Sequence, residues 1–415
     1  MSQTHKGRNT TVIPATPAAN EQPGDLVPEA LVSAQEFEQD FGEPLAQILD
    51  LDTWNDGSDL RAVFEQLDRE IGAALLEEDG FRAEVRKRVF PLIAKRPNAP
   101  KEAGVFRAAR RQLLDAQMKV LFNGGIEACD GTCPSHDTLP LTVTQIGVCL
   151  VSYLGGQGAW GHQLFRKDLR IRGQDPIEET LDLLQRRQQR AGIDQESRRD
   201  RLTDLGRRGI MTYAERAVLL HKAKAPWRMG HGHPAPYELL TGSGSMELLR
   251  RSLEVLSELI LDHRRFVFVP SAPNERLLLT IGHALHPSEF AIVETSERRM
   301  DQLLRLGHLR SEHRQRAEAF TCAAGPKIVA GVYRTFTESP PQIFYAHADF
   351  AQDAALIAMA DSLLQPQRAF PTLIDLADTV CGSLFGAAGF NSTIQSAYAS
   401  HGNPLRYLGE RETRR

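Results

Sequence analysis

Hydrophobic positions in the first third of the chain recur at helical spacing. Between Leu60 and Leu75, apolar residues lie three and four positions apart, which is typical of one face of an amphipathic helix. A second such stretch runs from Val105 to Leu121, with arginine and lysine on its outer side. The pattern therefore predicts that the chain from Leu31 to Leu121 is mainly helical.

The pattern changes to that of β-strands after Gly124-Gly125. Ile126–Thr132 is predicted to be a short strand that ends in a turn. Leu139–Tyr153 is dense in Val, Ile and Thr, and gives the strongest strand signal in the chain. After a glycine-rich turn, Gln163–Arg172 can return as a third strand. Three neighbouring strands with short connections predict an antiparallel meander.

Helices and short strands alternate in the rest of the chain. In order, the pattern predicts a helical region at 176–223, a strand at Pro234–Thr241, a helix at Ser245–Asp262, strands at Arg265–Pro270, Phe290–Glu294, Lys327–Tyr333 and Gln342–Ala346, and helices after Asp353 and Phe370. The order strand-strand-strand-helix-strand-helix-strand indicates an α/β protein with an RNase H-like core. That core is a mixed sheet with an antiparallel meander and flanking helices, here preceded by an N-terminal helical extension.

The chain is expected to divide into three parts. Residues 1–30 are rich in Thr, Pro, Ala and Asn and are predicted to be a disordered tail, because they bury too little apolar surface to offset the entropy of ordering. Residues 31–122 are predicted to be a helical region, and residues 123–415 one main domain. The N-terminus lacks the apolar core of a signal peptide, and no apolar run approaches the ~20 residues of a membrane span. We therefore expect a soluble, cytoplasmic protein without a membrane partner.

Composition narrows the class of protein only slightly. Hydrophobic residues make up 41% of the chain and the formal net charge is −4, which fits a globular protein with a core and restricts any DNA contact to a local patch. The five cysteines, an odd number, suit a reducing compartment. Cys129 and Cys133 lack a second Cys/His pair at zinc-like spacing, so they are interpreted as small buried thiols rather than metal ligands.

Asp130 is the first candidate for chemistry. It lies at the end of a predicted strand and is followed by Gly131, so that a carboxylate stands where backbone can approach a phosphate. Asp-Gly is also the commonest turn dipeptide, and both interpretations stay open on spacing alone. Asp56-Gly57 offers a comparison within the chain, since it precedes a helix rather than following a strand, which is typical of an N-cap.

Two glutamates are the other candidates from the pattern. Glu215 lies on a predicted helix beside Arg216, and its alternative role is a solvent-exposed glutamate paired with a neighbouring cation. Glu238 lies in a predicted apolar strand, where it is either an edge residue facing water or a ligand. Carboxylates from a strand end, a helix and another strand can converge on Mn²⁺ or Mg²⁺, hard ions that prefer oxygen ligands. Such an ion activates water for attack on a phosphate.

Two segments resemble the NurA family of nucleases. Ile126–Tyr153, with its Asp-Gly-Thr and long strand, is similar to the opening strands of that family. Ala369-Phe370-Pro371, followed by an apolar helix, is similar to its closing segment. In the family, a Gly-Tyr-Pro precedes a histidine eight residues after the tyrosine; Phe370 takes the place of the tyrosine and Asp378 that of the histidine. Glu215 fits the family's helical glutamate.

The sequence departs from the family at two positions. The family carries an aspartate at an Asp-Gly-Pro-like strand end, and the matching place here is Thr241-Gly242-Ser243. Glu238 is an odd number of residues from Thr241 and would point to the opposite face of a regular strand. Asp378 keeps a metal-ligating group but loses the imidazole that can shuttle a proton near neutral pH.

The resemblance implies a manganese-favouring nuclease that acts on single- and double-stranded DNA. It implies Mn²⁺ or Mg²⁺ as cofactor, a homodimer, and a HerA-type hexameric ATPase translocase as partner in DNA end processing or phage defence. It implies Asp130 as the central metal ligand, Glu215 as the second, and Asp378 or Glu238 as the remaining acid. The alternatives are a non-catalytic subunit that clamps DNA or docks on a translocase, and an unrelated metal-dependent hydrolase.

Basic and histidine-rich segments have two interpretations each. A group of arginines interleaved with acids either contacts phosphates or forms a solvated helix face: Arg186, Arg187, Arg190, Arg198, Arg199, Arg201, Arg207 and Arg208. The basic C-terminus from Arg406 to Arg415 either binds DNA or a partner, or is a plain exposed end. His221, His231 and His233 lie near the proposed site without a complete ligand set, and the alternative is a flexible loop.

Overall fold

The computed structural model describes residues 33–54, 60–97, 99–137, 141–166, 177, 181, 205–273, 275–306, 309 and 311–403. The chain forms two compact units, 1–77 and 78–415. The boundary between them falls inside helix α3 (Leu60–Arg88). The predicted tail at 1–30, the C-terminus from Arg406 and most of the arginine group lie outside the described residues.

The described part of the N-terminal unit is helical, as predicted. It contains α1 (Ala34–Phe41), α2 (Leu45–Ile48), a short 3-10 turn (Leu51–Thr53) and the first part of α3. Ser33 and Glu36 form a capping box that begins α1. The apolar stripe of α3 is present but exposed, with Phe64 and Leu75 each 62% accessible. Local capping and helix propensity, rather than a core, therefore form these helices.

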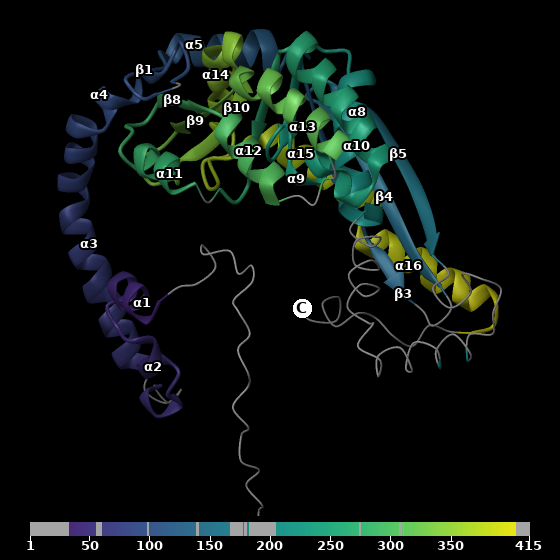
Figure 1. The fold of residues 1–415 in the computed structure, drawn as a ribbon, viewed down its shortest axis with the longest axis horizontal. Helices are drawn as coiled ribbons and strands as arrows, with labels where there is room; N and C mark the ends of the chain where they lie inside the picture. The colour runs from purple at the N-terminus through teal and green to yellow at the C-terminus, as the bar shows by residue number, and fades with distance from the viewer. Residues whose placement is uncertain are drawn as a thin grey trace, which may run out of the picture. The chain divides into compact units, whose positions relative to one another are not determined.

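The C-terminal unit is a mixed α/β structure built on one large sheet (Figure 1). Among the described residues, the strands follow the order β1-β8-β9-β10-β7-β6-β2-β4-β3, and β5 also pairs with β4. Their bounds are β1 Gly104–Arg107, β2 Ile126–Thr132, β3 Ser135–Asp137, β4 Thr142–Ser152, β5 Gly155–Arg166, β6 Trp227–His231, β7 Phe266–Val269, β8 Glu289–Thr295, β9 Ile328–Arg334 and β10 Gln342–His347. Neighbouring strands are antiparallel except for β2–β6 and β6–β7, which are parallel.

Helices cover both faces of this sheet. Their bounds are α4 Phe90–Ile93, α5 Arg110–Ala116, α8 Ile210–His221, α9 Tyr237–Thr241, α10 Met246–Ser257, α11 Arg276–His283, α12 Glu297–Leu306, α13 Ser311–Ala324, α14 Ala351–Ser362, α15 Thr372–Phe385 and α16 Ala387–Ser400. One hydrophobic cluster joins the sheet to α8–α13, and a second joins it to α5, α14 and α15. Strand β7 shows the alternation, because Phe266 and Phe268 lie in the first cluster while Val267 and Val269 lie in the second.

The predicted meander and most later strands are confirmed. β2 has the predicted bounds, and β4 and β5 follow it as antiparallel neighbours. β5 begins at Gly155, earlier than predicted, because the chain turns directly after β4. Helix α10 begins after Ser245, whose side chain accepts a hydrogen bond from the backbone of Leu248. The strands β7 to β10 also lie where the pattern placed them.

Two predicted elements were wrong, and one strand was missed. Val105–Arg107 belongs to β1, which pairs with β8, so the stretch before Leu121 is not wholly helical. Tyr237–Thr241 is helix α9 rather than a strand, because Pro236 precedes it and Gly242 ends it in the left-handed region. The strand in this part of the chain is β6, which the pattern did not predict.

Buried polar groups hold β6 in place beside β2. Glu127 accepts hydrogen bonds from the backbone of Lys224 and Ala225, in the turn before β6. Arg228, 6% exposed, donates to the carbonyls of Ala223 and Ala225 in the same turn. These bonds satisfy the backbone at the start of β6, and so set its register against β2.

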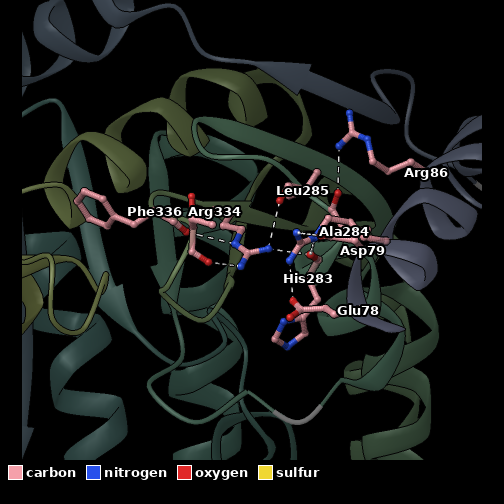
Figure 2. A network of polar contacts seen from close by, with 10 residues as sticks. Glu78, Asp79, Arg86, His283, Ala284, Leu285, Arg334 and Phe336 are labelled. Atoms are coloured by element: carbon pink, nitrogen blue, oxygen red, sulfur yellow. Dashed lines mark hydrogen bonds and ion pairs between the residues drawn. The ribbon is translucent and has the colours of Figure 1, made fainter. Parts of the chain in front are cut away.

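Three arginines bind the C-terminal end of α11 (Figure 2). Arg82 and Arg334 both donate to the carbonyl of His283, at 3.3 and 2.7 Å. Arg86 donates to the carbonyl of Ala284 at 3.0 Å. Because the last carbonyls of a helix lack partners within it and carry partial negative charge, these cations stabilise the helix end. Since Arg82 and Arg86 lie on α3, they also fix the C-terminal part of that helix to the sheet-bearing unit.

One helical stretch, Thr372–Ser400, is long and apolar enough to cross a membrane by length and composition. It consists of α15 and α16, which Gly386 separates. Leu373, Ile374 and Ala377 of α15 are buried against the sheet. These apolar residues of α15 are thus part of the protein core, whereas Leu384 near its end is 57% exposed.

Candidate active site

Strand β2 lies between helices α8 and α15, which pack on its opposite faces. Its side chains alternate, with Ala128 in the cluster that contains α15 and Cys129 in the cluster that contains α8. Asp130 therefore projects toward α15, and Gly131 faces α8. The end of β2 is the place where residues of both helices meet the strand.

Gly131 is required for the close approach of Glu215 to the strand. A Cβ atom at Gly131 would lie 2.7 Å from Glu215 Oε1 and 3.0 Å from Met211 Cγ. Gly131 is within β2 and is not among the described glycines with positive φ. The glycine of the Asp-Gly pair thus accommodates a carboxylate rather than forming a left-handed turn.

Three of the predicted acids influence one another electrostatically. The pKa of Asp130 is raised to about 7, first by burial and then by the nearby carboxylates of Glu215 and Asp378, against the opposing effects of the Gly131 N–H and Arg216. Glu215 is 7% exposed, and burial raises its pKa, although the adjacent Arg216 opposes the rise. Asp378 lies on α15 and is exposed. Asp130 thus lies within electrostatic range of an acid from each flanking helix.

Arg216 is a buried cation whose role the sequence pattern did not indicate. It is 2% exposed, and its Nη1 lies 3.0 Å from Glu215 Oε2. Its Nη2 donates to the carbonyls of His231 and His233, each at 3.0 Å. Its guanidinium stacks 4.6 Å from the ring of Phe268. One feature of the sequence does indicate that Arg216 is buried. Arg216 is three residues after Tyr213 and four before Leu220, which places it on the apolar side of α8.

The three histidines have different environments. His221 is exposed at the end of α8. His233 is buried, with a pKa lowered to about 3, first by burial and then by Arg299, and it contacts Ser296 at 3.2 Å. His231 ends β6 and lies half-buried, with its Nε2 2.9 Å from Ser271 Oγ. Because Arg216 binds the carbonyls of His231 and His233, this loop is held at the site.

Glu238 and Thr241 are not at a strand end. Glu238 is half-buried in the first turn of α9, where its charge raises the pKa of Glu215. Thr241 is buried, and its hydroxyl donates to the carbonyl of Tyr237 at 2.8 Å. The strand that ends beside Asp130 is β6, whose last residue is His231. The residues at the strand end next to Asp130 are therefore His231-Gly232 and not Thr241-Gly242.

The donor set fits a hard divalent cation that is shared with a substrate. In the part of the chain that the structure describes, no group of three or more His, Cys, Asp or Glu side chains is placed to hold a metal ion. Mg²⁺ and similar ions are commonly held by one or two carboxylates together with water and phosphate oxygens. Asp130 and Glu215 supply that chemistry, and Gly131 leaves the space in which Glu215 Oε1 lies. The five cysteines are free; Cys129 is a buried thiol, as expected, whereas Cys133 is only half-buried and lies just beyond β2.

Arginine residues of the predicted basic group can be placed only in part. Arg207 and Arg208 lie in a short π-helical turn (Leu205–Gly209) that leads into α8. The other members lie outside the described residues, so the two interpretations of the group stay predictions.

The fold is similar to solved NurA nuclease structures over most of the chain. No protein-family model matches the chain, and no curated protein matches its sequence. The NurA nuclease from Sulfolobus solfataricus aligns with 82% of this chain and 99% of its own, with 8% identity and a TM-score of 0.41. NurA with manganese aligns with 72% of this chain and 96% of its own, with 8% identity and a TM-score of 0.37. NurA bound to dAMP and manganese aligns with 86% and 95%, with 10% identity and a TM-score of 0.33. At this level, similarity assigns no activity, so function is inferred from the residues of the site.

Proposed function

We propose that this chain is a divalent-metal-dependent DNA nuclease in which Asp130 and Glu215 hold Mn²⁺ or Mg²⁺. The observation that carries the proposal is that two carboxylates from different elements meet at the carboxyl end of β2. Glu215 packs against Gly131 from the side of α8, and its charge acts on Asp130, whose side chain projects toward α15. Carboxyl ends of parallel strands are the usual place for ligands in α/β sheets, and β2, β6 and β7 run parallel. This placement favours a site open to a substrate.

The strand order supports an RNase H-like core as part of this proposal. Five neighbouring strands follow the order β5-β4-β2-β6-β7, in which the first three form an antiparallel meander and the last two run parallel to β2. Helix α8 connects the meander to β6, and α9 and α10 connect β6 to β7. The sequence predicted an order of this kind with its fourth strand at Pro234–Thr241, whereas the strand at this point of the chain is β6.

The protein's own groups would prepare the site. When bound, the ion supplies a water molecule of lowered pKa and polarises the phosphate. Asp130 anchors the ion from the strand, and Glu215 offers Oε1 while Arg216 holds Oε2 at 3.0 Å. Asp378 is exposed on α15, the helix toward which Asp130 projects, and would contact the ion or its water from there. Without an imidazole at this position, Asp378 acts as a ligand or as a hydrogen-bond acceptor for the water.

Cleavage of an end-labelled linear duplex tests the proposal. The full chain would be incubated with Mn²⁺, with Mg²⁺ and with EDTA, beside Asp130→Asn and the control Asp353→Asn, which changes an exposed acid on α14. We expect metal-dependent cutting that falls by at least about 100-fold in Asp130→Asn and is unchanged in the control. Full activity of Asp130→Asn would refute the assignment, and no cutting by the unaltered chain, either alone or with the proposed ATPase partner, would refute the nuclease.

A non-catalytic DNA-clamping or translocase-docking subunit is the second candidate. It is favoured by the lack of a third metal-ligating side chain placed with Asp130 and Glu215 among the described residues. Electron paramagnetic resonance of added Mn²⁺ separates the two functions. A nuclease binds Mn²⁺ in an Asp130-dependent manner, whereas a clamping subunit binds DNA without such a site.

Partners and cell compartment are proposed from the sequence resemblance alone. We propose DNA as substrate, a homodimer, a HerA-like hexameric ATPase as partner and a cytoplasmic location, in DNA end processing or phage defence. Co-purification of this chain with such an ATPase, and stimulation of cleavage by ATP in the mixture, would support the pairing. An unrelated metal-dependent hydrolase would instead ignore DNA in both assays.

A further inference from the structure

His231 lies beside Asp130 on the same face of the sheet. In the parallel pair of β2 and β6, Ala128 is aligned with Met229 and Cys129 with Gly230, so the next residues along are Asp130 and His231. Ala128 and Met229 both belong to the cluster that contains α15. Since side chains alternate along both strands, Asp130 and His231 project toward α15 together.

Helix α15 and the segment before it approach the His231 ring from that side. The ring lies 6.4 Å from that of Phe370, and the charges of Asp378 and Asp375 act on it. Asp375 is itself paired with Arg368, 2.7 Å away. His231 therefore lies on the face of the sheet that α15 covers, beside Asp130 in register and within range of the charge of Asp378.

The contacts of His231 with Ser271 define which ring nitrogen carries the proton. The backbone N–H of Ser271 donates to His231 Nε2 at 3.1 Å. Since a backbone N–H is only a donor, Nε2 must accept, and in the neutral ring the proton is on Nδ1. Because an imidazolium ring has no acceptor nitrogen, this contact requires the neutral ring. The ring thus presents an N–H at Nδ1.

Nδ1 has no hydrogen-bond partner in the described part of the chain. It is also not among the buried polar atoms that lack one, so solvent reaches it. A rigidly held donor that is open to solvent next to a metal-binding carboxylate is suited to an anionic oxygen of a substrate. The phosphodiester is the group that brings such oxygens to this site.

We propose that His231 is a phosphate-binding residue, whose Nδ1–H donates a hydrogen bond to a non-bridging oxygen of the phosphate cut at this site. The inference rests on the proposed nuclease function. Ligation of the metal by Nδ1 is disfavoured, because the proton would then move to Nε2 and meet the Ser271 N–H. A metal-bound histidine instead normally donates its second N–H to an acceptor.

Nitrogen NMR of the full chain, selectively labelled at histidine, tests the first step. The chemical shifts of His231, assigned with His231→Ala, are expected to show a protonated Nδ1 and an unprotonated Nε2 at neutral pH. A ring protonated at Nε2 would overturn the proposal.

Three variants then test the phosphate contact. The affinity for a fluorescent single-stranded oligonucleotide would be measured by anisotropy in Ca²⁺, and Mn²⁺ affinity by electron paramagnetic resonance. We expect His231→Ala to weaken oligonucleotide binding about tenfold, as for the loss of one hydrogen bond to a charged group, and to change Mn²⁺ affinity less than twofold. His231→Asn places an amide N–H near the Nδ1 position and should restore most of the affinity. Ser271→Ala keeps the backbone donor and should bind like the unaltered chain.

The outcomes separate this inference from the proposed function. If the unaltered chain cuts DNA and His231→Ala binds the oligonucleotide equally well, the phosphate contact alone is refuted. A tenfold loss of Mn²⁺ affinity in His231→Ala, or nitrogen coupling to Mn²⁺ that this variant removes, would make His231 a metal ligand and overturn the inference. If the unaltered chain neither binds nor cuts DNA, the nuclease function fails and the inference fails with it.

Discussion

Replacement of Gly131 by alanine is the sharpest test of the site geometry. The new Cβ would lie 2.7 Å from Glu215 Oε1 and 3.1 Å from Glu215 Cγ, whereas ordinary van der Waals contact begins near 3.4 Å. Relief requires a displacement of about 0.7 Å, the difference between 3.4 and 2.7 Å. Glu215 is 7% exposed and is held by Arg216, so it has little room to move away.

The expected effect on stability is small, and the effect on metal binding is large. Overpacking of a buried position costs about 1–3 kcal/mol, and replacing glycine by alanine within a strand returns about 0.5–1 kcal/mol. The net loss in the free energy of unfolding is thus about 0–2.5 kcal/mol. A carboxylate ligand displaced by a fraction of an ångström should lower Mn²⁺ affinity about 10- to 100-fold, which is the range for disturbed ligand positioning.

Two measurements on each variant decide the outcome. Mn²⁺ affinity would be measured by electron paramagnetic resonance, and the free energy of unfolding by urea titration. Gly156→Ala is the matched control, because a Cβ there meets no atom within 4 Å and its φ is not in the left-handed region. Unchanged Mn²⁺ affinity in a folded Gly131→Ala variant would refute the role assigned to Glu215.

Three further predictions concern the surroundings of the site. Arg216→Lys keeps the charge but loses the planar guanidinium group that binds Glu215 and the carbonyls of His231 and His233. The rate of DNA cleavage should therefore fall about tenfold or more in a folded variant. Normal cleavage kinetics would contradict a positioning role for Arg216. Burial raises the pKa of Asp361 from 3.8 to about 7, so the carboxyl group of Asp361 keeps its proton in the folded state up to that pH. The protonated carboxyl contributes stability that is fully present below about pH 4 and is lost as the pH rises through 7. Asp361→Asn should therefore gain stability relative to the unaltered chain between pH 4 and 8, by up to about 4 kcal/mol in urea unfolding; a pH-independent difference would exclude this titration. Arg86→Ala leaves Glu289, which is 8% exposed, without the ion-pair partner that lies 2.6 Å away. The free energy of unfolding, measured by thermal unfolding, should fall by about 3 kcal/mol, and a loss below about 0.5 kcal/mol would show that the pair contributes little.

The sequence by itself determined the elements whose pattern is local. β4 is a long run of β-branched residues, and α10 has both an apolar stripe and an N-cap at Ser245, so neighbouring residues alone identify them. Asp130 and Glu215 were selected as candidates for the same reason, since one ends a strand and the other lies on an amphipathic helix. Their proximity was an expectation from the order of elements, and the packing of Glu215 on Gly131 agrees with it.

Tertiary structure alone decided the other half of the site. Trp227–His231 has no alternating apolar and polar pattern, because β6 is buried between β2 and β7 and even its Arg228 is buried, bound to carbonyls of the preceding turn. The burial of Arg216 and the position of His231 beside Asp130 both follow from that pairing. Parallel pairing joins residues that are about a hundred positions apart, as Cys129 and Gly230 are, and its stability comes from contacts that no local window of sequence contains.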